Sequence, residues 1–316
     1  MSPASKLLAG VELGGTKCVS ILGTGPEDVR AQERLPTGER EETLRQIEAV
    51  LERWRGEFGP VRALGIASFG PVDLKPGSPT YGSITSTNKP GWRDTDVAKR
   101  LGRKLSVPVG FDTDVNGAAL AEGRWGAAQG LDSFAYVTVG TGIGVGSIVR
   151  GRPIFGMNHT ELGHIRVVRK PGDDFAGVCT FHGDCIEGLA SGPAIEARAG
   201  RPASQLPPDH PAWEYVAHGL GQLVHTMVLT TAPQRIFLGG GVMSAQAHLF
   251  DRIREELKRS LNHYVEAAEL EQGLGQYIVA PGLGTMAGPL GALALAADAE
   301  LSVAVQQAPV ASAATR

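Results

Sequence analysis

Hydrophobic positions at the start of the chain form short continuous runs and one helical pattern. Residues 7–13 and 18–22 are apolar runs on either side of a pair of glycines, which predicts two strands joined by a tight turn. Residues 61–67 predict a third strand. Residues 41–58 between them predict an amphipathic helix, because apolar side chains recur at steps of three and four: Leu44, Ile47, Leu51, Trp54 and Phe58.

A long polar segment follows the third strand. Residues 70–92 are rich in Pro, Gly, Ser and Thr, and a loop of this length is more typical of a functional loop than of a simple connection. A helix near residues 94–105 and a strand at 107–111 come next. An alanine-rich helix is then expected to run to about residue 128.

The second half of the chain repeats the opening pattern. Strands predicted at 134–139 and 144–149 flank a glycine-rich turn, as in residues 7–22, which indicates an internal duplication. The rest alternates between helices and strands, which favours an α/β fold with mixed sheets. The expected elements are helices at 189–198 and 212–230, a strand at 235–238, a helix with Phe250, Ile253, Leu257 and Leu261 on one face, a strand at 277–280 and a closing helix at 286–299. Residues 301–316, rich in Ala, Ser and Pro, are expected to be a disordered tail.

Composition narrows the class of partner. A chain of 316 residues is long enough for two domains, and a net charge of -3 with mixed signs excludes a basic face for nucleic acid or a polybasic membrane patch. Small molecules are the expected partners. The N-terminus shows no signal-peptide pattern and no window approaches eighteen consecutive apolar residues, so we expect a cytoplasmic protein. Three cysteines also fit a reducing compartment better than a disulfide framework.

Cysteines and histidines gather in one stretch of the second half. Cys179, His182 and Cys185 stand at intervals of three, and His164 lies fifteen residues upstream. This is a plausible tetrahedral Cys₂His₂ set for zinc. The alternative is two buried cysteines and two ordinary histidines. Four protein ligands would close the zinc site, so we interpret it as structural rather than catalytic.

Three glycine-rich turns follow predicted strands. The Walker P-loop and the dinucleotide-binding pattern are both absent from the sequence, but other phosphate-binding turns remain open. In the first turn, backbone N–H groups, a hydroxyl and an ammonium group could all face an anion, although an ordinary hairpin turn is the alternative. The residues concerned are Gly14, Gly15, Thr16 and Lys17, then Gly140, Thr141 and Gly142, then Gly239, Gly240 and Gly241.

Two carboxylates have candidate roles in phosphoryl transfer: one follows the strand predicted at 107–111, and the other directly precedes the first glycine turn. Asp114 is the candidate general base, and its alternative role is the N-cap of the following helix. The two roles are compatible, because phosphoryl transfer needs mainly a positioned acceptor for the hydroxyl proton. Glu12 could hold a water molecule of Mg²⁺ or be a polar strand residue. Asn88, Glu161 and Glu187 lie on glycine-flanked loops and could bind vicinal sugar hydroxyls, although each alone would be an ordinary surface residue.

The order of these motifs resembles that of the ROK family of sugar kinases, over nearly the whole chain to about residue 295. The motifs are Glu12-x-Gly14-Gly15-Thr16-Lys17, Asp114 with Asn116, Gly140-Thr141-Gly142-Ile143-Gly144, Glu161-x-Gly163-His164 and the cysteine segment. The usual cysteine pattern of the family is C-x-C-G-x-x-G-C, whereas this chain has Cys179-Thr-Phe-His182-Gly-Asp-Cys185. Three features resemble the bacterial fructokinase branch of the family. They are this different cysteine pattern, Glu12 where many members have Asp, and the run Glu187-Gly-Leu-Ala-Ser-Gly-Pro-Ala.

The resemblance implies a two-lobed actin-like ATPase (ribonuclease H-like) fold. The smaller lobe would span residues 1–122, with helix 286–299 packed on it, and the larger lobe with the zinc-binding loop would span 123–285. The resemblance also implies ATP with Mg²⁺, phosphate roles for the first two glycine turns, and nucleotide contact at the third. Asp114 would take the proton of the sugar hydroxyl. Asn88, Glu161, His164 and Glu187 would touch the sugar, and His164 would also bind zinc.

The expected activity is therefore transfer of the γ-phosphoryl group of ATP to the 6-hydroxyl of fructose. A kinase for glucose, mannose or an N-acetylhexosamine is the first alternative, since one or two loop contacts decide the sugar. A sugar-sensing regulator of the same family is a second, weakened because about nine residues precede Gly10, too few for a helix-turn-helix region. A homodimer is possible.

Overall fold

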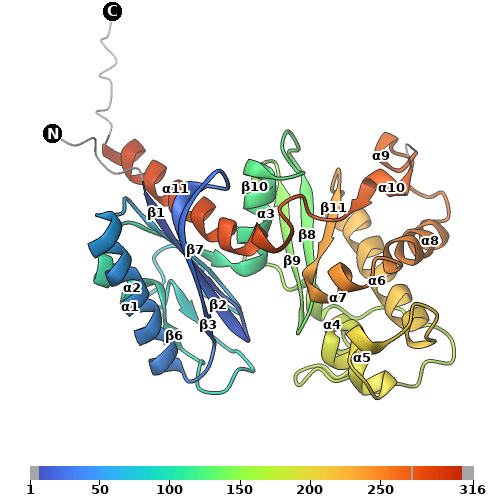
Figure 1. Cartoon of the computed structure of the whole chain (residues 1–316). Coiled ribbons are helices and arrows are strands. Elements are labelled where there is room, and N and C mark those ends of the chain that lie inside the picture. Colours follow the sequence, from blue (N-terminus) through green and yellow to red (C-terminus); the bar gives the residue numbers. More distant parts are fainter. Residues whose placement is uncertain (1–6, 272, 308–316) are drawn as a thin grey trace, which may run out of the picture. The chain divides into compact units, whose positions relative to one another are not determined.

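The computed structural model describes residues 7–271 and 273–307 and divides into two compact units (Figure 1). The first unit, unit 1, contains the chain up to Asp114 and the segment from Pro289 onward. The second, unit 2, is Val115–Gly288. Each unit is built around its own five-stranded sheet.

The sheet of unit 1 has the strand order β3-β2-β1-β4-β7. Strands β1, β2 and β3 run antiparallel, whereas β1, β4 and β7 are parallel, so the sheet is mixed as predicted. The strands are β1 (Leu8–Leu13), β2 (Lys17–Gly25), β3 (Asp28–Pro36), β4 (Leu64–Ser68) and β7 (Val109–Thr113). The predicted hairpin at residues 7–22 is confirmed. Strand β3 was not predicted.

Two helices cover this sheet with their apolar sides. Helix α1 (Arg40–Phe58) buries Leu44, Ile47, Leu51 and Trp54, which confirms the predicted core side. Phe58 was predicted on the same side, but it is the last helical residue and is 39% exposed, because the helix has passed beyond the core there. Helix α2 (Ala98–Leu105) begins later than predicted, since the short hairpin of β5 (Ser83–Ile84) and β6 (Thr95–Asp96) uses the residues before it.

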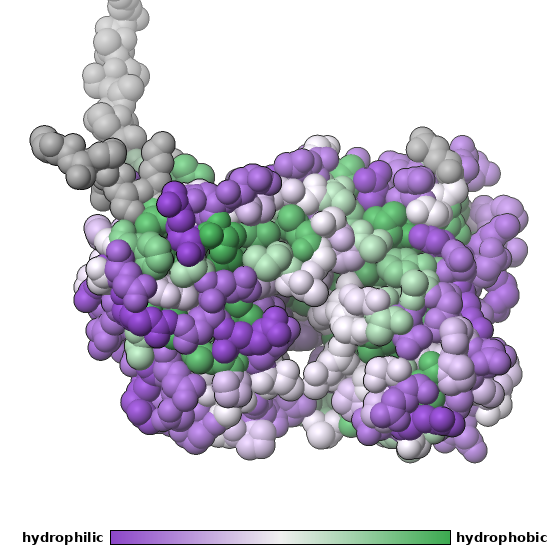
Figure 2. Space-filling view, viewed as in Figure 1, coloured by the Kyte–Doolittle hydropathy of each residue, from purple (hydrophilic) through white to green (hydrophobic). Residues whose placement is uncertain are grey.

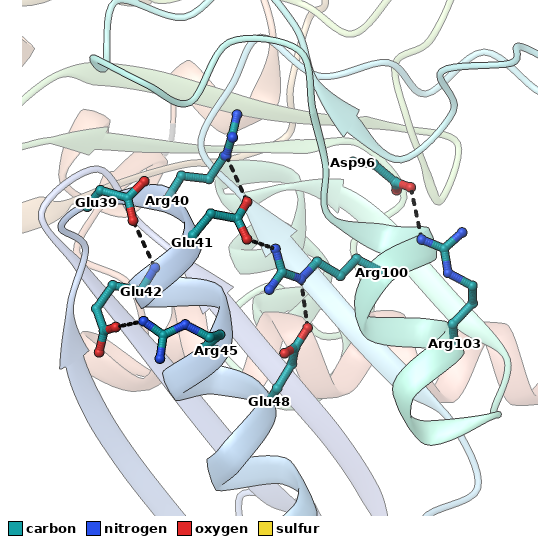
Figure 3. A network of polar contacts seen from close by, with 9 residues as sticks. All are labelled: Glu39, Arg40, Glu41, Glu42, Arg45, Glu48, Asp96, Arg100 and Arg103. Atoms are coloured by element: carbon teal, nitrogen blue, oxygen red, sulfur yellow. Dashed lines mark hydrogen bonds and ion pairs between the residues drawn. The ribbon is translucent and has the colours of Figure 1, made fainter.

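Ion pairs join α1 to α2 (Figure 3). Arg100 of α2 donates to Glu41 and to Glu48 of α1, both at 2.7 Å, and its side chain lies between the two carboxylates. Arg100 is 24% exposed and Glu48 is 17% exposed, so the bond between them is less screened by solvent than a surface pair would be, whereas Glu41 is 52% exposed. The contact fixes α2, and the loop that leads into it, against the start of α1.

Helix α11 (Ala287–Gln307) packs against a row of glycines in unit 1. Gly10, Gly65 and Gly110 are direct neighbours on the three parallel strands β1, β4 and β7. A Cβ atom on Gly65 would lie 1.8 Å from the backbone oxygen of Ala292, and one on Gly110 would lie 2.2 Å from that of Leu295. The missing side chains therefore let the helix backbone lie directly on the sheet.

Helix α11 also continues beyond its predicted end. The prediction ended it at residue 299, whereas the structure continues it to Gln307, because no glycine or proline interrupts its last turns. Residues 301–307 of the predicted tail are thus helical, and the remainder lies outside the described residues. By length and composition, Gly284–Ala304 could cross a membrane, but half of that window is buried inside the protein, as a core helix would be. Figure 2 shows hydrophobic and hydrophilic residues mixed along it.

The sheet of unit 2 has the corresponding order β10-β9-β8-β11-β12. Its first two pairings are antiparallel and its last two are parallel, as in unit 1. This repeated topology is what the predicted duplication requires. The strands are β8 (Phe134–Val139), β9 (Ile143–Val149), β10 (Arg152–Pro153), β11 (Ile236–Gly239) and β12 (Ile278–Val279).

The helices of unit 2 include the predicted long helix at 212–230. The predicted helix at 189–198 is instead two short helices, because the Ser191 side chain caps a new helix by accepting from the Ala194 N–H. The helices are α3 (Asp114–Trp125), α4 (Ile186–Ala190), α5 (Gly192–Ala199), α6 (Ala212–Thr230), α7 (Gly240–Ala245), α8 (Leu249–Leu261), α9 (Ala268–Glu271) and α10 (Leu274–Tyr277). Helices α6 and α8 bury a large apolar core that includes Trp213, Leu223 and Ile253.

Candidate functional site

The parallel strands of unit 1 end together. Leu13, Ser68 and Thr113, the last residues of β1, β4 and β7, are paired in one row across the sheet. Adjacent strands lie about 4.8 Å apart, so Leu13 and Thr113 are separated by roughly 10 Å. The next residues along the chain are Gly14 and Asp114. The first glycine turn and the candidate base therefore follow strands that end at the same edge of the sheet.

The first of these features is the Gly14 turn (residues 14–17). Its ends are closed by a hydrogen bond from the Gly14 N–H to the Lys17 carbonyl at 3.0 Å. A Cβ atom on Gly14 would lie 2.8 Å from that same oxygen, which explains the need for glycine. Gly15, Thr16 and Lys17 are exposed, so their N–H groups, hydroxyl and ammonium group are accessible to an anion.

Glu12 precedes this turn on β1 and is half-buried. Burial raises the pKa of its carboxyl group above the ordinary value, while the charges of Lys17 and Arg34 counteract part of that rise. The carboxyl group therefore lies close enough to the turn to sense the charge of Lys17. A polar position in an otherwise buried strand fits either of the predicted roles.

Asp114 is the first residue of α3 and directly follows β7. It is half-buried, and the residues behind it in the helix, Val115 and Asn116, are buried. Just before Asp114, the Thr113 N–H donates a hydrogen bond of 2.7 Å to the Asp112 carboxylate. A carboxylate in the first turn of a helix is stabilised in its charged form by the helix dipole.

Asn88 lies on the Asn88 loop (residues 85–92) and is exposed. The loop is anchored by Trp92, which is fully buried and donates from its Nε1 to the Gly38 carbonyl at 3.0 Å. Phe69 packs edge-on against the Trp92 ring. The loop is thus held by unit 1 at one end, while Asn88 remains accessible to a ligand.

The Cys/His group (His164, Cys179, His182 and Cys185) comes together in unit 2. One ligand atom from each of the four residues lies within 4.8 Å of all the others. The Nδ1 of His164 is 3.5 Å from the Cys185 sulfur and 3.7 Å from the Cys179 sulfur, and the Nδ1 of His182 is also 3.7 Å from the Cys179 sulfur. Tetrahedral zinc bonds imply a sulfur-to-nitrogen edge of roughly 3.5 Å. The four residues therefore fit the predicted zinc geometry.

Local structure positions these ligands. Cys179 and Gly183 exchange two backbone hydrogen bonds, at 3.1 and 2.9 Å, which close the turn that carries His182. Cys185 is completely buried and precedes α4, and His164 ends a short 3₁₀ helix, Leu162–His164. Gly188 packs so closely on this turn that a Cβ atom would lie 1.9 Å from the Gly183 carbonyl oxygen.

Glu187 connects the Cys/His group to the second glycine turn. One of its carboxylate oxygens accepts a hydrogen bond from the Ile143 N–H at 3.0 Å, and the other lies 4.0 Å from the Nε2 of His164. Gly142 must be a glycine, since a Cβ atom there would lie 2.6 Å from the Glu187 carboxylate. Burial, and then the charge of Glu187, raise the pKa of Glu161 to about 7. These two carboxylates thus face a common region beside His164.

The second and third glycine turns are neighbours in unit 2. They are the Gly140 turn (residues 140–142), closed by the Gly140 N–H and the Gly142 carbonyl at 2.9 Å, and the Gly239 turn (residues 239–241). A Cβ atom on Gly140 would be 3.9 Å from the N of Gly241. Gly240 has a φ of 86° and begins α7, so the third turn is a strand-to-helix junction rather than a free loop.

The predicted residues thus form two sets, each within one unit. Unit 1 contains Glu12, the Gly14 turn, Asn88 and Asp114. Unit 2 brings together the Cys/His group, Glu161, Glu187 and the other two glycine turns. Sequence analysis did not select His159, whose buried side chain lies 3.5 Å from Glu161. It also did not select Thr37 or Lys89, which contact the Gly14 turn through backbone carbonyls that leave no sequence pattern.

Two units with the same order of strands in a mixed sheet define the class of the fold as that of the actin-like ATPases. The chain belongs to the ROK family, whose model matches residues 8–299, and the resemblance seen in the motifs is confirmed. A fructokinase of Zymomonas mobilis is 42% identical over 307 residues, which cover 95% of this chain and 99% of that protein. A fructokinase of Pediococcus pentosaceus is 40% identical over 290 residues, covering 92% and 97%.

A solved structure gives the same family. The ROK family glucokinase from Streptomyces griseus, in complex with glucose and AMPPNP, matches with a TM-score of 0.72 and 26% identity. The match covers 92% of this chain and 99% of that one. The fold predicted from the sequence, with its mixed sheets and its Cys/His segment, is confirmed by these similarities and by the described strands.

Proposed function

We propose that the protein is an ATP-dependent fructokinase that transfers the γ-phosphoryl group of ATP to the 6-hydroxyl of D-fructose. The observation that carries phosphoryl transfer is the row of strand ends in unit 1, from which the Gly14 turn and Asp114 follow at one edge. The choice of fructose is supported by the relatives named fructokinase, which are 40% and 42% identical over more than nine-tenths of the chain.

In the proposed reaction Asp114 accepts the proton of the fructose 6-hydroxyl. The hydroxyl oxygen forms a bond to the γ-phosphorus while the bond from that phosphorus to the β–γ bridging oxygen breaks, and ADP leaves with the electron pair. A positioned acceptor is sufficient for this proton because the transition state is loose. Asp114 thus acts mainly by geometry.

Phosphate binding is assigned to the first two glycine turns. The N–H groups of Gly14 and Gly140 close their own turns, so each of these glycines would shape a phosphate-binding turn rather than donate to the phosphate. The exposed Gly15, the hydroxyls of Thr16 and Thr141 and the ammonium of Lys17 offer donors to phosphate oxygens. The neighbouring Gly239 turn is assigned to the nucleotide, because glycines allow a close approach of the backbone. Mg²⁺ bound with ATP would neutralise charge on the phosphates, and Glu12 would hold one of its water molecules.

Sugar binding is assigned to Asn88, Glu161, His164 and Glu187. Carboxylates and an amide provide acceptors and donors for vicinal hydroxyls. The Cys/His group is assigned to zinc, because two thiolates and two imidazoles at tetrahedral spacing match its preferred ligands. Four protein ligands leave no open position, so zinc would brace the segment that carries His164 and Glu187. A structural zinc also fixes the orientation of the histidine ring.

A sugar panel tests this proposal. Initial rates with ATP and fructose, glucose, mannose or an N-acetylhexosamine should give the highest kcat/KM for fructose. A higher value for another hexose would reassign the substrate within the same reaction. Sugar binding without turnover of any of them would instead identify a regulator.

The remaining assignments concern the partners, the location and the oligomeric state of the protein. Sugar and ATP are the proposed partners, with neither nucleic acid nor membrane involved, and the proposed location is the cytoplasm, where ATP is made available. A homodimer is proposed as the oligomeric state. Light scattering of the purified protein would give twice the chain mass of 33.1 kDa, whereas a value near the single mass would exclude it.

A further inference from the structure

Three segments of unit 1 meet at Thr37, the residue that follows β3. Its N–H donates to the Thr16 carbonyl at 3.0 Å, and its hydroxyl donates to the Gly14 carbonyl at 2.8 Å. Thr37 therefore holds the Gly14 turn by two hydrogen bonds from one residue. The third segment to reach this point is the Asn88 loop.

Lys89 makes the contact from the Asn88 loop. Its ammonium group donates to the Gly15 carbonyl at 2.7 Å and to the Thr37 carbonyl at 2.9 Å. The lysine is half-buried, which reduces competition from water. Hydrogen bonds from a charged donor are shorter and stronger than neutral ones. A single side chain thus joins the proposed phosphate-binding turn to the proposed sugar-binding loop.

The two ends of the Asn88 loop are held by Thr85, which bonds to the Pro71 carbonyl, and by Trp92, so Lys89 holds the middle of the loop. Trp92 is fully buried, and its Nε1 donates a hydrogen bond to the Gly38 carbonyl. The neighbouring carbonyl in the chain, that of Thr37, accepts the hydrogen bond from Lys89. The Lys89 N–H donates to the Thr87 hydroxyl at 3.2 Å, which shapes the turn on either side of Asn88. Asn88 itself is exposed and adjoins Lys89 in the chain.

We propose that Lys89 is a positioning residue that couples sugar binding to nucleotide binding in unit 1. This rests on the proposed function, in which the Gly14 turn binds phosphate and Asn88 binds the sugar. A ligand that orders the turn also orders the Gly15 carbonyl, which holds Lys89 and with it the Asn88 loop. The second ligand then meets a loop that is already ordered and binds more tightly.

The test compares Lys89→Met, Lys89→Arg and the control Lys99→Met by calorimetry of fructose binding with and without AMPPNP. Lys99 is matched because its ammonium also donates to a backbone carbonyl, that of Pro79, away from the Gly14 turn. Wild type and Lys99→Met should bind fructose at least about fivefold more tightly with AMPPNP. Lys89→Met should lose most of this gain, and Lys89→Arg, which keeps charge and donors, should restore part of it.

Hydrogen exchange of the ligand-free proteins supplies a readout that does not depend on the substrate. The amides of residues 14–17, 87–89 and 91 should exchange faster in Lys89→Met than in wild type or Lys99→Met. Unchanged exchange, or an undiminished gain from AMPPNP in Lys89→Met, would overturn the proposal. The proposal would also be overturned if AMPPNP did not increase the affinity of the wild-type protein for fructose. Failure of the wild-type protein to phosphorylate fructose would instead count against the proposed function. The exchange result would still decide whether Lys89 joins the Gly14 turn to the Asn88 loop.

Discussion

The imidazole of His164 lies between the two cysteine sulfurs of the Cys/His group and the carboxylate of Glu187. Its Nδ1 is 3.5 Å from the Cys185 sulfur, and its Nε2 is 4.0 Å from a Glu187 oxygen. The two nitrogens of one ring thus face two different parts of unit 2. A metal bound on the Nδ1 side would fix the ring and leave the Nε2 side for the sugar.

Removing one sulfur ligand should therefore damage sugar binding before ATP binding. We expect the wild-type protein to contain about one zinc per chain and Cys179→Ser to lose most of it. In this variant the KM for fructose should rise about tenfold or more, whereas the KM for ATP should change less than about twofold. Elemental analysis and kinetics provide the measurement. Cys18→Ser is the matched control, because Cys18 is buried in unit 1 and donates to the Leu35 carbonyl. A full zinc complement in Cys179→Ser would refute the ligand set.

Replacing the candidate base should affect the rate and not the binding. Asp114→Ala removes the proton acceptor, and the loss in kcat is expected to be about 10²-fold or more. Calorimetric dissociation constants for fructose and AMPPNP should stay within about threefold of the wild-type values, since the side chain is not needed to hold either ligand. Near-normal kcat would exclude the role of base.

The glycine row beneath α11 makes a prediction about stability. Gly65→Ala places a Cβ atom 1.8 Å from the Ala292 backbone oxygen, so the helix must move, at a cost of about 1–3 kcal/mol in the free energy of unfolding. Gly56→Ala is the control, because Gly56 is exposed within α1 and a Cβ atom there meets nothing within 4 Å. That change should stabilise by about 0.5 kcal/mol. Equal unfolding midpoints for the two variants would contradict the packing described for α11.

The pair of Asp173 and Arg198 predicts a dependence of stability on pH. Burial alone raises the pKa of Asp173, but hydrogen bonds from Arg198 and the Phe175 N–H, with the positive charges nearby, outweigh it and lower the pKa. The folded pKa is below the unfolded value of about 3.9, so the contribution is present above that pH and is lost as pH falls through the folded pKa.

Asp173→Asn should accordingly lower the free energy of unfolding by about 3 kcal/mol at pH 7, because Arg198 is only 10% exposed and would lose its partner. The difference from wild type should shrink below about pH 4. Asp94→Asn is the control, since its side chain is 77% exposed beside Arg93 and should matter little. Denaturant titrations at several pH values measure both. A difference for Asp173→Asn that grew on acidification would contradict the assigned sign.

Much of the fold follows from local patterns, and the misses have physical causes. Helix α1 was predictable because Leu44, Ile47, Leu51 and Trp54 all face one core. Strand β3 was not, because it is at the edge of its sheet and its residues are largely half-buried or exposed, with charged side chains such as Glu33 and Arg34. A strand without a buried side carries no alternation of apolar and polar residues.

The candidate site likewise contains residues that the sequence predicts and residues that it does not. The Cys/His group was predictable because three ligands stand at fixed short spacing and only certain residue types bind zinc. Thr37 and Lys89 could not be found in this way, because their partners are the carbonyls of Gly14, Gly15 and Thr37 itself. Any residue has a carbonyl, so such contacts depend on where the fold places the backbone.

The most direct test of the central proposal is the identity of the product made from ATP and carbon-labelled fructose. Carbon NMR should show coupling to phosphorus at C6, with one ADP formed per phosphosugar, and 6-deoxyfructose should not be phosphorylated. Coupling at C1, or turnover of 6-deoxyfructose at the rate of fructose, would contradict transfer to the 6-hydroxyl.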